Sequence, residues 1–132
     1  MSPDDEDRMI SDVCERMARN NRVDRAESDR LLLERAKQLD AEYLSGKAKP
    51  ADARFSPRLT SSYGNANLHS GVIQVAERLR QSPQWVIDYL LIHEMAHLIV
   101  PGHSTEFWGL VDRYRYAERA KGYLICMSQL ED

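Results

Sequence analysis

The segment His93-Glu94-Met95-Ala96-His97 constrains the fold of this chain more than any other feature. Two histidines four residues apart on an α-helix are separated by about 400° of rotation and by roughly 6 Å along the axis. Both imidazoles therefore lie on one stripe and can reach a single metal ion, while the glutamate between them can reach a water molecule activated by that ion. The segment predicts a helix that carries a metal site.

A third histidine follows shortly after this helix. Pro101 ends the helical geometry and Gly102 permits a reversal of the chain, so that His103 can return toward the metal. Three imidazoles with one open position are typical of catalytic zinc, whereas structural zinc sites close all four positions with protein ligands. We therefore predict that Zn²⁺ is bound by three residues and that Glu94 is the general base. The predicted metal ligands are His93, His97 and His103.

Other polar and aromatic residues have weaker claims to the site. Glu106 could be a fourth ligand or could hold a ligand's ring N–H, but an acidic residue in the first turn of a helix is the simpler interpretation. His69 stands alone in a predicted turn and is expected at the surface, while Trp85 and Trp108 are expected only to pack. Six side chains are candidate donors to an oxyanion: Tyr89, Tyr114, Tyr116, Tyr123, Arg113 and Arg115.

Composition excludes several classes of protein. A chain of 132 residues that is 42% hydrophobic is long enough for one compact domain with its own core. Its 18 basic and 21 acidic residues leave a net charge of −3, so no basic field favours a nucleic acid partner. Cys14 and Cys126 have no paired spacing and are interpreted as reduced thiols. The acidic N-terminus is no secretory signal, and the longest apolar stretch, 85–100, contains charged residues, so we expect a soluble cytoplasmic protein with no membrane span.

The first third of the chain predicts a helical arm, residues 1–46. Ser2-Pro3 and the acids that follow favour a helix start, with Asn20-Asn21 as its end. A second helix is predicted from about Asp24 or Ser28 to Ser45, with Gly46 as its stop. Its apolar stripe comprises Leu31, Leu32, Ala36, Leu39 and Tyr43.

The remainder, residues 47–132, predicts an α+β core. Residues 54–62 and 72–76 are interpreted as strands, and residues 63–67 as the turn between them. We expect the strand at 72–75 to pair as an edge strand with an extended peptide substrate. The active-site helix should run from Ser82-Pro83 to Ile99, and a helix capped by Ser104 should continue to about 117 or 119. Residues 121–127 are short and apolar and should pack back on the core.

Several stretches together resemble the YgjP-like metallopeptidase family. They are 71–79, 82–98, Pro101-Gly102-His103, Glu106-Phe107-Trp108 and 117–124, so that the resemblance covers roughly residues 54–125. It implies a zincin-type core, with a small mixed sheet, an active-site helix and a following helix. It further implies a peptidase acting on peptide or protein substrates, with His93, His97 and His103 as metal ligands and Glu94 as the catalytic residue. The family usually has Trp-Gly-Ser-Cys-Ser/Thr where this chain has Tyr63-Gly64-Asn65-Ala66-Asn67.

Two other functions compete with a zinc peptidase. A zinc-binding scaffold without catalysis would need the histidines but not Glu94, so the glutamate favours an enzyme. A metal-dependent hydrolase of a non-peptide amide or ester would use the same water and the same base, and the sequence does not separate it from a peptidase. Among related proteases, metzincins require glycine where this chain has Val100, and the lack of basic excess argues against a SprT-type protease with DNA-bound substrates.

Overall fold

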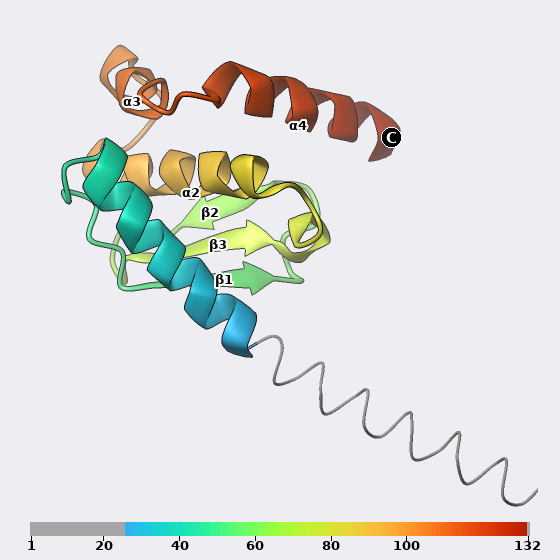
Figure 1. Cartoon of the computed structure of the whole chain (residues 1–132), viewed down its shortest axis with the longest axis horizontal. Coiled ribbons are helices and arrows are strands. Elements are labelled where there is room, and N and C mark those ends of the chain that lie inside the picture. The colour runs from blue at the N-terminus through green and yellow to red at the C-terminus, as the bar shows by residue number, and fades with distance from the viewer. Residues whose placement is uncertain (1–25, 132) are drawn as a thin grey trace, which may run out of the picture.

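A central helix, α2 (Gln84–Ile99), lies between a small sheet and two further helices (Figure 1). The computed structural model describes residues 26–131, so the helix predicted for residues 2–21 lies outside the described residues. On one side α2 packs against the strands β2 (Gly64–Ala66) and β3 (Val72–Ala76). On the other side it contacts α3 (Thr105–Val111) and α4 (Ala117–Glu131). The α+β fold class predicted from the sequence is confirmed.

The sheet has three strands in the order β1-β3-β2. The strand β1 (Asp52–Ser56) runs parallel to β3, and β2 runs antiparallel to it, with Gly64 opposite Val75. The prediction that the strand at 72–75 forms an edge was therefore wrong, because β3 has a partner on both sides. The interpretation of residues 63–67 as only a turn was also wrong, since three of them form β2, which is an edge.

The first predicted strand is shorter than expected and begins earlier. It covers 52–56 instead of 54–62, because Pro57 cannot donate to a ladder and the Arg58 amide turns back to the Ser56 hydroxyl at 3.3 Å. A backbone amide on the outer edge of β1 has a side-chain partner: the Phe55 amide donates a hydrogen bond to the Asp29 carboxylate at 3.0 Å. The helix that carries Asp29 thus blocks further strand pairing at this position.

The active-site helix agrees with its prediction and is apolar on nearly all sides. It begins after Pro83 and ends before Val100, whose extended backbone (φ −128°) leads into Pro101. Gly102 then adopts φ +87°, a conformation that glycine reaches without steric cost. A helix covered on two faces must be hydrophobic around most of its circumference. Accordingly ten of its residues are buried, including Glu94.

Residues 26–43 form a helix that contributes to the same core as the rest of the chain. Leu32, Ala36 and Leu39 are buried, whereas Leu31 is 49% exposed and does not belong to the buried stripe predicted for it. The helix ends as expected, with Gly46 at φ +70° donating its amide to the Asp40 carbonyl. The division of the chain into an arm (1–46) and a core (47–132) remains a prediction.

A buried ion pair joins this helix to α2. The Arg35 guanidinium donates two hydrogen bonds to the Asp88 carboxylate, at 3.0 and 2.6 Å, and the Gln84 side chain donates a third at 2.8 Å. Asp88 is 4% exposed, so these three hydrogen bonds replace the contacts with water that its carboxylate loses on burial. Because Asp88 lies five residues before His93, the pair also fixes the helix that carries the candidate metal site.

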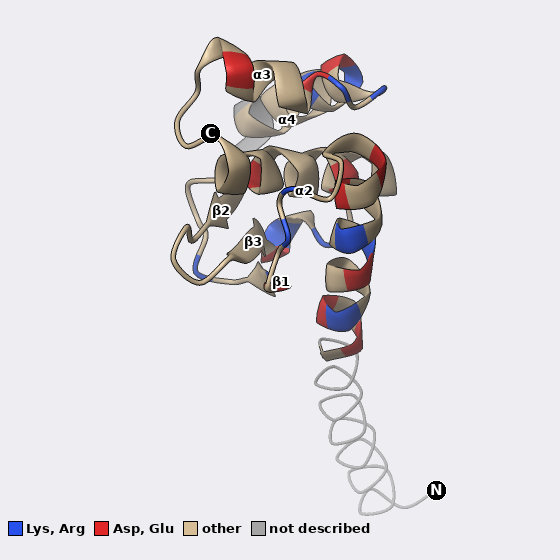
Figure 2. Ribbon diagram, turned by 90° about the vertical axis from the view of Figure 1, so that its left-hand side faces the viewer, with Lys and Arg blue, Asp and Glu red and all other residues tan. Residues whose placement is uncertain are grey.

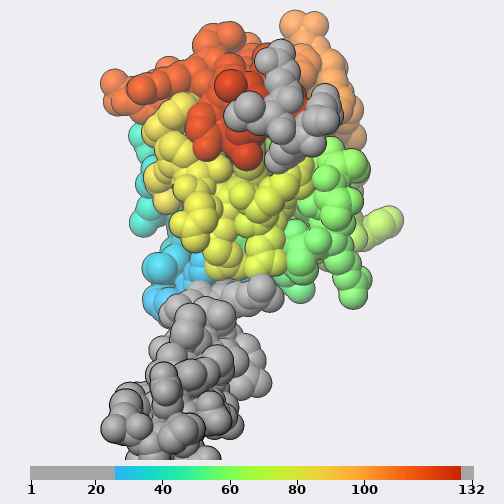
Figure 3. Space-filling model, turned by 90° about the vertical axis from the view of Figure 1, so that its right-hand side faces the viewer, coloured from blue at the N-terminus to red at the C-terminus, as the bar shows by residue number. Residues whose placement is uncertain are grey.

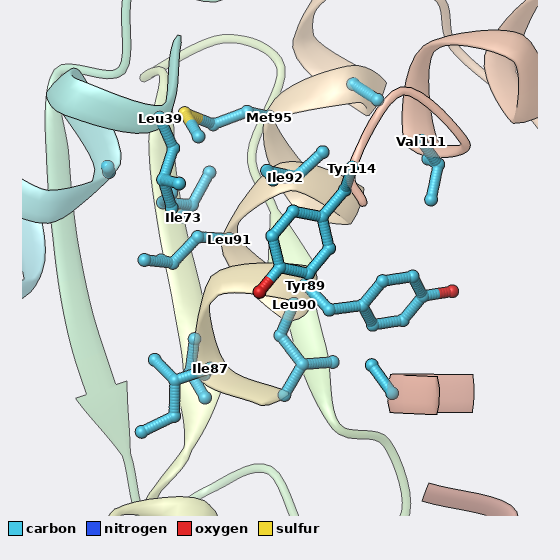
Figure 4. Close-up of a cluster of buried hydrophobic side chains, with 14 of the residues drawn as sticks. Leu39, Ile73, Ile87, Tyr89, Leu90, Leu91, Ile92, Met95, Val111 and Tyr114 are labelled. Carbon is cyan, nitrogen blue, oxygen red and sulfur yellow. The ribbon is translucent and has the colours of Figure 1, made fainter. Parts of the chain in front are cut away.

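Large apolar side chains of α2 fill the space between the layers (Figure 4). Leu91, Ile92 and Met95 are fully buried, together with Leu39 and Ile73 from the neighbouring helix and sheet. Their burial stabilises the fold by about 1.5–3 kcal/mol per side chain. This packing holds α2 firmly against the sheet.

The chain after His103 forms two helices instead of one. The predicted helix was expected to reach 117 or 119, but α3 ends at Val111 and the chain turns before α4 begins at Ala117. The turn lets Tyr114 enter the core, where its hydroxyl donates to the Trp85 carbonyl at 2.9 Å. Residues 121–127, expected to be a short packing segment, lie within α4.

Charged residues of both signs lie along the helix of residues 26–43 (Figure 2). Arg30, for example, pairs with Glu27 and Glu34 on the exposed face of this helix. Within the part of the chain that the structure describes, no helix is long and apolar enough to cross a membrane.

Candidate metal centre and active site

The three histidines predicted as metal ligands lie together. One ring nitrogen from each of His93, His97 and His103 lies within 4.8 Å of the others, and no other group of this kind occurs among the described residues. The first two rings project from one face of α2, with centroids 5.2 Å apart. The third comes from the loop after Gly102, and its centroid lies 4.8 Å from that of His97. The reversal of the chain at Pro101-Gly102 therefore places His103 as the sequence predicts.

Two aromatic side chains of α3 hold these rings. Phe107 is fully buried, and its ring stacks on that of His97 with centroids 4.2 Å apart and an interplanar angle of 18°. Trp108 stacks on His103 at 5.8 Å and meets His93 edge-on at 5.7 Å. Ser104 caps the helix that carries both residues by accepting a hydrogen bond from the Phe107 amide. Trp108 packs as expected, but its partners are the histidines, which the sequence did not indicate.

The electrostatic environment favours the neutral form of the two histidines on α2. Burial, reinforced by the neighbouring histidines and Lys121, lowers the pKa of His93 to about 4. Burial and the nearby His103 also lower the pKa of His97. A neutral imidazole has a free lone pair, which is what a metal ligand requires. Three imidazole nitrogens suit zinc, so the residues fit the predicted ion.

Glu94 lies beside this cluster on the inner side of α2. Its side chain is 6% exposed, and burial raises the pKa of its carboxyl to about 7. A carboxylate with a pKa near the working pH is well matched to accepting and returning a proton. Because Glu94 follows His93 directly, it points beside the ligand stripe and is not one of the three clustered donors. Its position therefore suits a base that acts next to a metal ion.

The edge strand β2 approaches Glu94 very closely. A Cβ atom added to Gly64 would lie 2.9 Å from the Glu94 Oε1 atom and 3.0 Å from its Cγ. Gly64 is not among the glycines with positive φ, so the need for glycine here is one of space and not of backbone conformation. The sequence did not indicate this contact, although Gly64 is the one residue of the segment 63–67 that keeps the glycine of the family pattern before the departures at Asn65 and Ala66.

Replacement of Gly64 by Ala should therefore displace the Glu94 carboxylate. We expect turnover to fall by roughly 10- to 100-fold, the range that follows when a reacting group moves by about 1 Å. The measurement is kcat with metal content determined on the same sample, which should be unchanged. The control is Gly109→Ala on α3, where nothing lies within 4 Å of the added carbon. Equal kcat values for both variants would show that Gly64 does not position the carboxylate.

The structure distinguishes the other residues that the sequence offered as candidates by whether they lie at the site. Glu106 and His69 are exposed, and neither belongs to the histidine cluster. Of the six candidate oxyanion donors, Tyr89 alone lines the cavity that opens beside Glu94. The Tyr114 hydroxyl is held by Trp85, and that of Tyr123 lies 3.4 Å from the Ser82 hydroxyl. The others lie elsewhere: Arg113 contacts the Tyr43 carbonyl, and Arg115 stacks over Tyr116.

Comparison with known proteins agrees with this site. The chain matches the YgjP-like metallopeptidase domain over residues 10–121, so the match begins well before residue 54, where the resemblance in the sequence began. Among solved structures it is similar to the metallopeptidase zymogen abylysin of Pyrococcus abyssi, with 31% sequence identity and a TM-score of 0.58. The similarity covers 76% of this chain and 92% of abylysin. No curated protein matches the chain. The protein is therefore a metallopeptidase and belongs to the YgjP-like family.

Proposed function

We propose that this protein is a zinc-dependent peptidase in which His93, His97 and His103 hold the ion and Glu94 is the general base. The observation that carries the proposal is the position of the Glu94 carboxylate, which lines the same cavity as His93 and lies against Gly64 of the edge strand β2. A bound zinc ion would supply Lewis-acid chemistry, activating a water molecule and polarising the carbonyl of the scissile bond. Glu94 would take a proton from the attacking water and deliver it to the leaving amine.

The outer edge of β2 is the surface on which an extended peptide would lie. The Asn67 amide donates to Val72 and the Ala76 amide donates to Tyr63, each at 2.9 Å. In an antiparallel ladder the bonded pairs alternate, so residues 63, 65 and 67 face β3. The amide and carbonyl groups of Gly64 and Ala66 therefore face away from the sheet. Because β2 has only β3 as a neighbour among the described strands, these groups are placed to pair with a substrate backbone.

The test of the proposed function is hydrolysis of a broad peptide library by metal-loaded and metal-stripped protein. Zinc-loaded protein should contain about one ion per chain and cleave peptides, because the cluster offers three imidazole nitrogens to one ion. Chelation should abolish cleavage, and zinc added in equimolar amount should restore it. Cleavage that persists in fully stripped protein would overturn the proposal. Cleavage of esters or non-peptide amides alone would instead support a hydrolase of another substrate class.

Ala66→Pro tests the role of the edge strand. Proline removes the outward-facing N–H without removing a bond to β3, and edge strands tolerate it at such positions. Loss of one hydrogen bond should raise KM by roughly 2- to 10-fold, with zinc content unchanged. Asn65→Ala is the control, since it alters a side chain on the same strand and leaves both outward amides in place. An unchanged KM in Ala66→Pro would mean that peptides bind elsewhere.

The location of the protein in the cytoplasm and the lack of a nucleic acid partner remain predictions from the sequence.

A further inference from the structure

A cavity of about 470 Å³ opens directly beside Glu94. Three elements that are distant in the sequence form its walls. Tyr89, Leu90 and His93 belong to α2, while the segment of residues 62–64 leads into β2. Leu124 and Ile125 come from α4. Figure 3 shows this end of the molecule, where α4 (red) lies above the segment from β3 into α2 (yellow).

The walls of this cavity are held in place by the fold. The Tyr63 hydroxyl donates a hydrogen bond to the Leu124 carbonyl at 3.0 Å, which joins the start of β2 to α4. On the other side, the Trp85 ring of α2 meets the Tyr123 ring of α4 edge-on at 5.6 Å. The cavity is therefore a defined feature between α2, β2 and α4, formed by side chains that also make structural contacts.

The interior of the cavity carries little net charge. Apart from Glu94, its only charged lining residue is Lys121. The Lys121 ammonium is already bound by Asp112 at 3.1 Å and by Glu118 at 3.2 Å, and it also lies over the Trp108 ring. Its charge is thus compensated by two carboxylates outside the cavity. In the proposed function Glu94 is committed to the attacking water, so a charged substrate group entering here would lose its own hydration without gaining a free partner, which is unfavourable.

Tyr89 contributes an uncharged polar group to the lining of the cavity. As a whole residue it is only 4% exposed. Burial raises the pKa of this phenol, so the hydroxyl stays protonated and can donate or accept a hydrogen bond. Figure 4 shows the Tyr89 ring directed away from Leu91 and Ile87, which face the other side of α2. The hydroxyl therefore adds one uncharged polar contact beside the apolar side chains Leu90, Leu124 and Ile125.

We infer that this cavity is a specificity pocket for a large uncharged side chain, aliphatic or aromatic, next to the scissile peptide bond. The inference rests on the proposed function, because it places the substrate on the edge of β2 with Glu94 at the reacting bond. A side chain that points inward from a peptide on β2 enters the space between Tyr89 and α4. Leu124 and Ile125 of α4 then determine which side chains fit, which gives the C-terminal helix a role in substrate selection.

Ile125 allows a test that leaves the fold intact. It is 60% exposed at the rim of the cavity, so a charged residue there does not disturb the core. The next residue, Cys126, is also exposed but does not line the cavity, so it offers a matched control on the same helix. The experiment compares wild type, Ile125→Asp and Cys126→Asp. Each zinc-loaded protein is assayed on peptides that differ only at the residues flanking the scissile bond.

We expect wild type to cleave peptides with Leu or Phe at one flanking position at least about 10-fold more efficiently than those with Ala, Asp or Lys. Ile125→Asp should raise the ratio of kcat/KM for Arg over Leu at that position by roughly two- to fivefold, as for a partly exposed charge pair. Cys126→Asp should leave this ratio unchanged, and zinc content should be the same in all three proteins.

Two results would overturn the inference while leaving the proposed function in place. One is cleavage by wild type with no preference at either flanking residue. The other is an Arg-over-Leu ratio that is equal in Ile125→Asp and Cys126→Asp. Failure of zinc-loaded wild type to cleave any peptide would instead refute the proposed function and, with it, the inference. Retention of the 10-fold preference together with the shift in Ile125→Asp alone would support it.

Discussion

Glu94→Gln should retain one zinc ion per chain and lose peptide hydrolysis by 100-fold or more. Gln has nearly the shape of Glu but cannot accept a proton from the attacking water, and a general base typically contributes about 10²–10⁴-fold to the rate. Glu94 is buried beside the histidines, with its pKa raised to about 7, and no other carboxylate belongs to the described cluster. No other described side chain in this site can therefore take over its role.

The loss should appear in kcat and not in KM, because the contacts that hold the substrate survive the substitution. Steady-state kinetics on one well-cleaved peptide, with zinc content measured on the same samples, provide the test. Glu106→Gln is the matched control: the chemical change is the same, but the residue is exposed on α3. Equal turnover in wild type and Glu94→Gln would exclude Glu94 as the base.

Replacement of both His93 and His97 by Ala should abolish tight zinc binding. The two rings project from one face of α2 and supply two of the three clustered nitrogens, so their loss leaves only the exposed His103. Loss of a residue that merely supports a ligand already weakens metal affinity by about 10- to 100-fold, and we expect a larger effect here. Metal content after dialysis and a competition titration with a chelator would measure it.

The control for the double variant is His69→Ala, which removes an exposed histidine from a turn away from the cluster. That variant should bind zinc as wild type does. Circular dichroism of the metal-free proteins would show whether the double variant keeps its helices, since both removed rings contact Phe107. A folded double variant that retains zinc at full occupancy would refute the assignment of the metal site.

The candidate metal site could be predicted because its geometry is local. The positions of His93 and His97 on one stripe follow from the helical repeat, and the return of His103 follows from the backbone preferences of Pro101 and Gly102. Proline and glycine residues likewise predicted both ends of α2 and the end of the preceding helix at Gly46. Each of these features depends on residues within about ten positions of one another, so the sequence contains the needed information.

Features that depend on distant partners were predicted less well. The three residues of β2 lack the length and apolar alternation of a strand, and they form one because β3 lies beside them. The same pairing makes β3 the central strand. The edge proposed to bind an extended substrate is therefore β2 and not, as predicted from the sequence, residues 72–75. The break between α3 and α4 was not predicted. It lets Tyr114 enter the core, and the contacts that hold Tyr114 there, with Trp85 and Tyr43, are to residues far away in the sequence.

The sequence by itself determined the candidate metal ligands and the helix that carries two of them, because helical spacing and the residue types that suit a metal ion are local properties. Only the tertiary structure decided what surrounds that chemistry: Phe107 and Trp108 against the histidines, Gly64 against Glu94, and α4 beside the cavity. Lys121, Leu124 and Ile125 lie on one stripe of a helix, yet nothing in that stripe indicates which element it faces. That choice depends on how α2, the sheet and α4 bury their apolar surfaces together, which is a property of the whole fold.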